Sequence, residues 1–171
     1  LAKRDLAAVR LMASAGLRRA EVSSLTVGQL DLNSEPPALL VRRKAKQELE
    51  RVTIGTKTAE SLVRWVSDHA RGKIVTDENG NDRGDPQKLA PLRLFPVGES
   101  LRRMLRRRAK QAGIKSPVRP HGLRHRGASE VAAAGFAALM AFGGWQCSDS
   151  ALHYLDDHEA NRQQALALTE F

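Results

Sequence analysis

Apolar residues recur at helical spacing along most of this chain, and a glycine follows several of the helical stretches. The spacing predicts helices over residues 5–14, 19–25, 58–69, 100–112, 120–135 and 136–142, followed by a last helix that carries Tyr154. Two short apolar segments, 38–41 and 51–54, flank the polar residues 42–50 and predict a β-hairpin. Residues 72–91 are polar and contain several turn residues, so they predict a loop. We therefore expect a mainly α fold with a small antiparallel β-sheet.

Composition limits the chain to one domain with an aliphatic core. A length of 171 residues is enough to bury such a core, and aromatic residues make up 4% of the chain. Cys147 is the sole cysteine, which excludes an intrachain disulfide and a multi-cysteine zinc site and fits a reducing, cytoplasmic and nucleoid-associated location. We expect no membrane span, because no apolar run approaches ~18 residues. Since Leu1 is not an initiator Met, we expect the chain to begin inside a longer protein.

Positive charge is concentrated in one stretch of the sequence. Lys and Arg number 28 against 19 Asp and Glu, which gives a net charge of +9 and an isoelectric point near 10.4. Residues 98–126 hold ten basic residues and one acid, whereas residues 127–171 hold six acids and a single Arg. A basic body followed by an acidic tail indicates a protein that binds a polyanion, so we expect nucleic acid as a partner.

Residues 16–21 read Gly-Leu-Arg-Arg-Ala-Glu and place an arginine just after a glycine that can end a helix. The planar guanidinium of Arg18 can bind two oxygens of a phosphate, which a lysine ammonium cannot do. A surface arginine at a helix junction is the alternative interpretation. The motif alone does not decide between the two.

Residues 121–125 read His-Gly-Leu-Arg-His and lie within a predicted helix. At helical spacing His121, Arg124 and His125 occupy neighbouring turns, so an imidazole and a guanidinium can converge on one small anion. A solvated basic face and a two-histidine metal site are the alternatives. The metal alternative is weak because no carboxylate or further ligand follows at the spacing of known zinc sites, and we expect no metal.

The motifs follow one another in a definite order. Gly-Leu-Arg-x-x-Glu at 16–21 precedes a hairpin lysine, Leu-Phe-Pro at 94–96, His-x-Leu-Arg-His at 121–125 and Gly-Gly-Trp at 143–145, with Tyr154 nine residues after Trp145. In order and spacing these residues resemble the catalytic domain of the tyrosine recombinases, the phage integrase family. The resemblance extends from Asp5 to the C-terminus. It implies the tyrosine recombinase catalytic-domain fold, with residues 1–171 as a single catalytic domain.

The resemblance implies a role for each matched residue. Arg18 and Arg124 would hold the non-bridging oxygens of the scissile phosphate, with Glu21 in support. His121 would assist proton transfer. Tyr154 would attack the phosphorus to give a 3′-phosphotyrosine and a free 5′-hydroxyl.

Two matched positions depart from the usual family pattern. The hairpin reads Arg-Lys-Ala-Lys-Gln at 43–47 where most members have Gly-Lys-Gly-x-Lys. Its lysine would protonate the leaving 5′-oxygen, a role that Lys44 matches best and for which Lys46 is the rival. Most members have a second His at the position of Trp145. The Cre-like branch has Trp there, as this chain does. Its indole N–H can donate a hydrogen bond while its ring packs on the helix of the nucleophile, and an ordinary core aromatic is the alternative.

The resemblance also implies the partners. We expect double-stranded DNA and no cofactor, because a phosphotyrosine keeps the bond energy for religation. The side chains expected to contact DNA are those of Arg42, Arg43, Lys46, Arg103, Arg107, Arg119, His125 and Arg126. A homo-oligomer, a tetramer on DNA, is implied, in which the tail helix 155–171 docks on a neighbouring protomer or folds back in cis. The family's N-terminal core-binding domain is expected to lie outside this chain, which should therefore bind DNA weakly.

The sequence thus predicts a site-specific DNA recombinase or integrase that cleaves and religates strands. A type IB topoisomerase-like enzyme and a non-catalytic DNA-binding module of the same fold are the alternatives. A degenerate module would be expected to lose at least one of the matched catalytic residues. All of them are present, which favours the enzyme.

Overall fold

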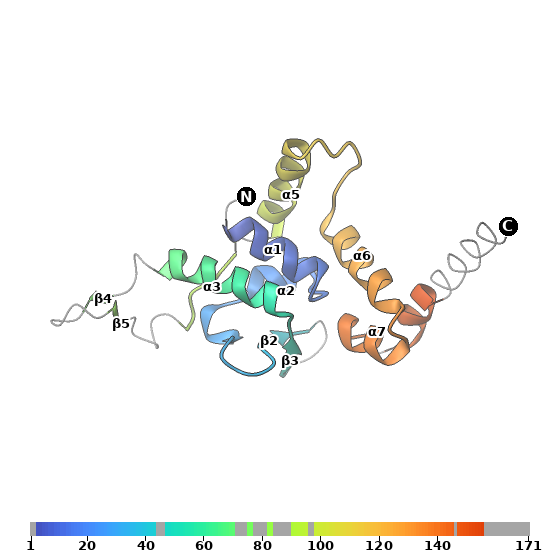
Figure 1. Ribbon diagram of the computed structural model, residues 1–171, viewed down its shortest axis with the longest axis horizontal. Helices are drawn as coiled ribbons and strands as arrows, with labels where there is room; N and C mark the ends of the chain where they lie inside the picture. The colour runs from blue at the N-terminus through green and yellow to red at the C-terminus, as the bar shows by residue number, and fades with distance from the viewer. Residues whose placement is uncertain are drawn as a thin grey trace.

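The structure is a computed structural model of the 171-residue chain (Figure 1). It describes residues 3–43, 47–70, 75–76, 82–83, 90–95, 98–145 and 147–155. Within these ranges the chain is mainly helical with a small three-stranded antiparallel sheet, as the apolar spacing predicts. No helix in these ranges is long and apolar enough to cross a membrane.

Helices and a small sheet form the larger part of the molecule, which we term the main body. Its helices are α1 (Lys3–Ala13), α2 (Arg19–Ser24), α3 (Thr56–Ala70) and α5 (Gly98–Gln111), with the 3-10 helix η1 (Val27–Gln29). The sheet has the order β1-β2-β3, with β1 (Leu30–Asp31), β2 (Ala38–Arg42) and β3 (Leu49–Thr53). Helix α1 packs against α3 and α5. Inward side chains of the sheet, Leu39, Val41 and Val52, join these helices in one aliphatic core.

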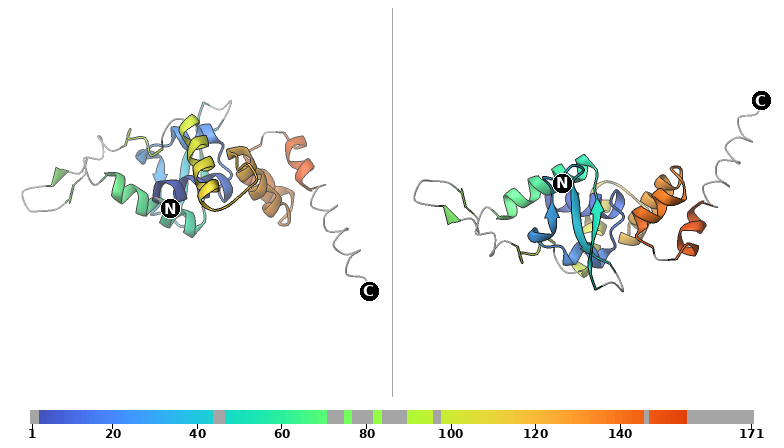
Figure 2. Two further views of the ribbon diagram at one scale, coloured as in Figure 1. Left: turned by 90° about the horizontal axis from the view of Figure 1, so that it is seen from above. Right: turned by 90° about the horizontal axis from the view of Figure 1, so that it is seen from below.

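A smaller part, the C-terminal unit, lies to one side of the main body in every view (Figures 1 and 2). It consists of α6 (Pro120–Ala132), α7 (Phe136–Gly143) and the helical residues 149–155. Helix α6 packs against both α1 and α7. The unit has its own small apolar cluster, formed by Ala128, Ala132, Leu139, Ala151 and Tyr154. The predicted nucleophile therefore lies outside the main aliphatic core.

Glycines let the C-terminal unit approach the end of α1. Gly16 has φ +63°, and a Cβ there would lie 2.5 Å from the carbonyl oxygen of Phe142. A Cβ on Gly127 of α6 would collide with the carbonyl oxygen of Ala13 and with the Phe142 ring. The two parts of the molecule therefore meet through close backbone contacts that leave no room for side chains at these glycines.

The helices predicted from apolar spacing are confirmed, with boundaries that move by a few residues. The predicted hairpin is confirmed as β2 and β3, which pair antiparallel. The segment 72–91, predicted to be a loop, contains the short strands β4 (Val75–Thr76) and β5 (Asp82–Arg83), and the prediction also omitted β1. Strands of two residues are too short for alternation of polar and apolar side chains to reveal them.

Candidate active site

A pocket of about 550 Å³ opens where the C-terminal unit meets the main body. Its lining residues are Arg18, Arg19, Ala20, Arg102, Arg119, Pro120, His121, Arg124, Trp145 and Tyr154. They come from the start of α2, from α5, and from α6 with the residue before it. Trp145 follows α7, and Tyr154 lies in the helical residues 149–155. The pocket thus brings together every predicted catalytic residue except the hairpin lysine. Lys44 and Lys46 lie outside the described residues.

Arg18 precedes the first residue of α2 and is held by the carboxylate of Glu21. Its backbone N–H donates to Glu21 Oε2 at 2.7 Å, and its Nη1 donates to Glu21 Oε1 at 3.0 Å. The Glu21 side chain is buried, whereas 33% of the Arg18 side chain is exposed to the pocket side. The carboxylate therefore fixes a guanidinium that still has free surface for a ligand.

Arg124 is 4% exposed and points inward from α6. Its Nη2 donates to the carbonyl oxygen of Gly143 at 2.6 Å, and its Nη1 donates to the carbonyl oxygen of Gly16. Its Cζ lies 5.1 Å from the centroid of the Trp145 ring, a cation–π contact. Burial and the nearby Arg18 guanidinium lower the pKa of Arg124 to about 10. Arg124 is therefore still charged at neutral pH and gives the pocket a fixed cation.

Tyr154 lies in the helical segment 149–155 and is 7% exposed. Its ring centroid is 4.8 Å from that of His125, in an edge-to-face contact, and 5.4 Å from that of Trp145. Alanines of α6 and of its own helix complete the packing around the ring. This packing fixes the direction of the phenol, which also lines the pocket that contains the two arginines.

His121 and His125 lie one turn apart on α6, as the helical spacing predicts, with ring centroids 6.3 Å apart. His121 is exposed at the pocket, where it can exchange a proton with a bound group. His125 is half-buried beside Tyr154, a contact that the sequence does not predict. In the described part of the chain, no cluster of three or more His, Cys, Asp or Glu side chains could hold a metal ion.

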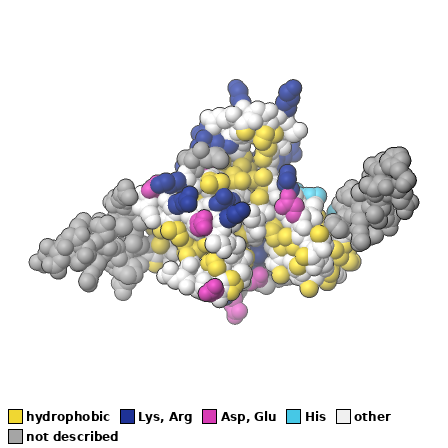
Figure 3. Space-filling view, in the orientation of Figure 1, with side chains coloured by type: hydrophobic (Ala, Val, Ile, Leu, Met, Phe, Trp, Pro, Cys, Tyr) yellow, Lys and Arg dark blue, Asp and Glu magenta, His cyan; other side chains and the backbone are white. Residues whose placement is uncertain are grey.

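Most of the arginines predicted to contact DNA are exposed. They are Arg42, Arg103, Arg107, Arg119 and Arg126. Figure 3 shows Lys and Arg side chains gathered over α5 and the body below it. Arg102 lines the candidate site, and with Arg106 and Lys110 it also lines an adjoining pocket of about 480 Å³. Sequence reasoning did not select Arg102, because the basic run on α5 does not show which arginine faces the site.

Arg43 does not lie on the surface, where a DNA contact was predicted. It is 2% exposed, its Nη1 donates to Glu21 at 3.1 Å, and its Nε lies 3.6 Å from Glu50 Oε1. The alternation of β2 continues past the end of the strand, so Leu39, Val41 and Arg43 are all buried. The guanidinium is enclosed against carboxylates and has almost no exposed surface, which does not fit the predicted DNA contact. The alternation of buried positions along β2 is the sequence signal that indicates a buried side chain at position 43.

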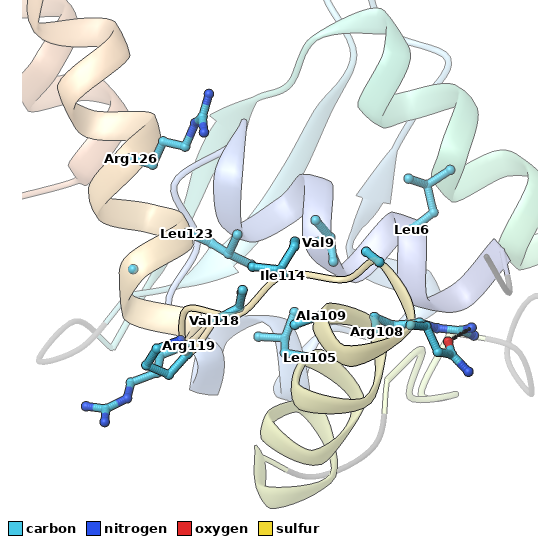
Figure 4. A pocket seen from close by; sticks show the side chains of 14 residues that line it. Leu6, Val9, Leu105, Arg108, Ala109, Ile114, Val118, Arg119, Leu123 and Arg126 are labelled. Atoms are coloured by element: carbon cyan, nitrogen blue, oxygen red, sulfur yellow. Dashed lines mark hydrogen bonds between the residues drawn. The ribbon is translucent and has the colours of Figure 1, made fainter.

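A larger pocket, of about 730 Å³, lies on another face of α6 (Figure 4). Apolar side chains from three helices converge on it, including Val9, Leu105 and Leu123 (Figure 4). Of the residues that line the candidate site, it shares Arg119 alone. It contains none of the predicted catalytic residues, so its size does not make it the site of the chemistry.

Known proteins match both the sequence and the fold. The family model described as "Phage integrase family" matches residues 1–161. A protein named tyrosine recombinase XerC from Actinobacillus pleuropneumoniae is 33% identical over 126 residues, which cover 71% of this chain and 36% of that protein. A protein of the same name from Azotobacter vinelandii is 34% identical over 139 residues, which cover 77% of this chain and 40% of that protein. The chain spans less than half the length of these relatives.

Solved structures share the fold. The crystal structure of XerA recombinase gives a TM-score of 0.71 at 24% sequence identity and covers 99% of this chain and 60% of that one. The structure of XerH site-specific recombinase bound to a palindromic difH substrate gives a TM-score of 0.70 at 16% identity and covers 99% of this chain and 46% of that one. The mainly helical architecture with a small sheet is therefore the fold of these recombinase chains.

Proposed function

Because the chain belongs to the phage integrase family, we propose that it is the catalytic part of a site-specific DNA recombinase or integrase. The reaction would cut a DNA strand and rejoin it to another strand by way of a 3′-phosphotyrosine on Tyr154. One observation carries the proposal: Tyr154 lines the same pocket as Arg18 and Arg124. The names of the relatives and the shared fold support it.

Arg18 and Arg124 would bind the non-bridging oxygens of the scissile phosphate. Negative charge gathers on these oxygens in the transition state, so donors that are already in position stabilise it most. Glu21 holds Arg18, and backbone carbonyl oxygens hold Arg124, so neither guanidinium has to be ordered when DNA binds. The site is therefore preorganised for a phosphodiester.

The Tyr154 oxygen would form a bond to phosphorus as the bond from phosphorus to the 5′-oxygen breaks. His121 would take part in moving the phenol proton, and Lys44 or Lys46 would give a proton to the leaving 5′-oxygen. One ester replaces another, so the step balances without an oxidant, a nucleotide or a metal ion. Attack of a 5′-hydroxyl on the phosphotyrosine reverses the step and religates the strand.

Trp145 would orient the site where most of the family uses His. The Cre-like branch also has Trp at this position. Its ring contacts both the Arg124 guanidinium and the Tyr154 ring. A Cβ on Gly143 would collide with the Trp145 ring, so the glycine makes room for it. We therefore assign Trp145 to the packing of the phosphate ligand and the nucleophile, with its indole N–H as a further donor.

Double-stranded DNA and further copies of the chain are the proposed partners. The exposed arginines of α5 and α6 would contact the phosphate backbone, which makes binding dependent on salt. A tetramer on DNA, with the segment 155–171 docked on a neighbour or in cis, remains our prediction. Residues 156–171 lie outside the described residues.

Two alternatives use the same fold or chemistry. A type IB topoisomerase-like enzyme would cleave in the same way and rejoin the original strand. A non-catalytic module would bind DNA without cleaving it. The family match and the assembled pocket favour the recombinase over both.

The test uses the full-length protein that contains these residues. Covalent protein–DNA adducts are recovered from cells that express it, and the attached DNA is sequenced to find the cleaved site. A nicked duplex with that site traps the intermediate in vitro. We expect wild type to form a detergent-stable 3′ adduct in the presence of EDTA, and we expect Tyr154→Phe to form none.

DNA binding by Tyr154→Phe should stay within about twofold of wild type, since phosphate contacts dominate the affinity. An adduct that survives in Tyr154→Phe, or one that EDTA abolishes, contradicts the proposal. Relaxation of supercoiled DNA without strand exchange would indicate the topoisomerase. Binding by wild type without any adduct would indicate the non-catalytic module.

A further inference from the structure

We propose that Arg43, a residue outside the pocket, positions both the phosphate-binding arginines and the turn that leads to the nucleophile. The inference rests on the proposed function. Arg43 stands at the end of β2, just before the hairpin lysine Lys44. It does not line the candidate site, so it acts through the residues that it contacts.

The first contact is with Glu21, which lies between two guanidiniums. Glu21 Oε2 accepts from the backbone N–H of Arg18 at 2.7 Å and from Nη1 of Arg43 at 3.1 Å, while Oε1 accepts from Nη1 of Arg18 at 3.0 Å. Both Glu21 and Arg43 are buried. Without Arg43, the buried carboxylate would keep Arg18 as its sole charged partner among the described residues and could rotate with it. Arg43 thus limits the positions that Arg18 can take.

The second contact is with the turn after α7. Gly144 has φ +53°, and a Cβ there would lie 2.7 Å from Nε, 2.8 Å from Cζ and 2.9 Å from Nη2 of Arg43. The guanidinium therefore lies directly against the backbone of Gly144. Gly143, the residue before it, accepts a hydrogen bond from Arg124, and Trp145 follows it. One side chain of the main body thus contacts the turn that places Arg124, Trp145 and, through Trp145, Tyr154.

The hydrogen bonding of Arg43 is incomplete. Its Nε and Nη2 are buried and have no hydrogen-bond partner among the described residues, although Nε lies within ion-pair distance of Glu50. Buried N–H groups that make no hydrogen bond cost stability. The charge of Arg43 also acts on the site, because it adds to the lowering of the Arg124 pKa that burial and Arg18 cause. A buried side chain whose donors are not all satisfied, and which contacts residues from both parts of the site, is suited to positioning.

The position also distinguishes this chain from the family that it resembles. In the resemblance described above, the usual hairpin motif has glycine where this chain has Arg43. A glycine could contact neither Glu21 nor Gly144 through a side chain.

The experiment uses the full-length protein and the nicked duplex described above. Arg43→Met keeps the length of the side chain and removes its charge, whereas Arg43→Lys keeps a charge that cannot contact Glu21 and Gly144 together. Arg51→Met on β3 is the matched control, because Arg51 is exposed and bonds to Asp31, away from the pocket. Each variant is measured for its DNA dissociation constant and for its rate constant of adduct formation at saturating duplex.

We expect the rate constant of Arg43→Met to fall about 10- to 100-fold, as a small misplacement of reacting groups can cause. Its dissociation constant should stay within about twofold, Arg43→Lys should recover part of the rate, and Arg51→Met should match wild type. A duplex with a 5′-thio leaving group, which needs no proton, should not restore the rate of Arg43→Met. A wild-type rate in Arg43→Met and Arg43→Lys, or a loss of affinity with an unchanged rate, would overturn the proposal. Restoration by the 5′-thio duplex would also overturn it, since Arg43 would then act through the hairpin lysine.

A second measurement separates this inference from the proposed function. In Arg43→Met, the amide of Gly144 should exchange its hydrogen about tenfold faster, while the amides of α1 keep their wild-type rates. Unchanged exchange at Gly144 refutes the positioning contact even if the protein cleaves DNA. If wild type forms no adduct but the exchange still rises, the contact stands and the assigned reaction falls. Should Arg43→Met fail to fold, Arg43→Lys carries both measurements, with the same sign of effect.

Discussion

The main body and the C-terminal unit differ in the apolar packing that supports them. The main body has a continuous aliphatic cluster shared by four helices and the sheet, whereas the buried cluster of the C-terminal unit consists of Tyr154, Leu139 and three alanines, with partly buried side chains around it. A part with fewer buried apolar contacts opens locally at a lower cost in free energy. Arg18 therefore stands on the part that we expect to be more stable, and the proposed nucleophile, Tyr154, stands on the part that we expect to open more easily. Arg124 is bonded to both, through Gly16 and Gly143.

Apart from the loss of Tyr154, the largest effect is expected at a lysine that lies between β2 and β3 in the sequence. If Lys44 is the general acid, Lys44→Ala should slow cleavage of a normal duplex by about 10²- to 10⁴-fold, and a 5′-thio leaving group should restore the rate. Lys46→Ala should instead behave as the loss of a phosphate contact. The reverse pattern would assign the acid to Lys46. Because the flanking strands β2 and β3 belong to the main body, neither change should loosen the C-terminal unit.

Lysine substitutions at the two pocket arginines test the comparison directly. Arg18→Lys and Arg124→Lys should each lower the rate of adduct formation by about 10²-fold, because an ammonium cannot reproduce the guanidinium geometry. Arg124→Lys alone should also speed limited proteolysis in α7, because Arg124 bonds to the carbonyl oxygen of Gly143. Equal protease resistance in the two variants would show that Arg124 does not hold the two parts together.

Trp145 tests the packing within the C-terminal unit. Trp145→Ala should lower the rate by about tenfold and the free energy of unfolding by about 1–3 kcal/mol, since the ring is half-buried. Trp145→His, which keeps a ring and a donor, should retain measurable activity. Urea unfolding and adduct kinetics measure the two effects. Wild-type behaviour of Trp145→Ala would make the residue a bystander.

The smallest effect on DNA binding is expected from the segment that follows the C-terminal unit. Deletion of residues 160–171 from the full-length protein should leave affinity for a single half-site unchanged. If the segment docks on a neighbour, the deletion should weaken cooperative assembly on two-site DNA, which gel-shift titration measures. Undiminished cooperativity would show that the segment folds back in cis or takes no part.

The sequence predicts the helices, and the His-x-Leu-Arg-His part of the candidate site, because these depend on local spacing. His121, Arg124 and His125 fall on neighbouring turns of α6 as their spacing requires, and the apolar alternation locates β2 and β3. The pairing of Tyr154 with the arginines came from the family resemblance, and the structure places them in one pocket.

The features that the sequence does not show depend on how distant segments pack. Which arginine of α5 reaches the pocket is set by the docking of that helix, so Arg102 was not selected. Arg43 belongs to a basic sequence segment, and charged side chains are usually exposed to solvent. Its carboxylate partner, Glu21, is far away in sequence, so the sequence does not reveal the buried ion pair. The contact between His125 and Tyr154 joins two helices whose approach no local pattern encodes.

The two hydrogen bonds of Arg124 to backbone carbonyl oxygens set how many N–H groups it can offer to a bound anion. One N–H on each terminal nitrogen points to a carbonyl oxygen, of Gly16 and of Gly143, which leaves Nε–H and the second N–H of each terminal nitrogen. The same side chain can therefore close the interface between the two parts and still present donors to an anion. A lysine ammonium that satisfied both carbonyl oxygens would retain a single N–H for phosphate. The choice of arginine at position 124 is thus a matter of donor number as well as of charge.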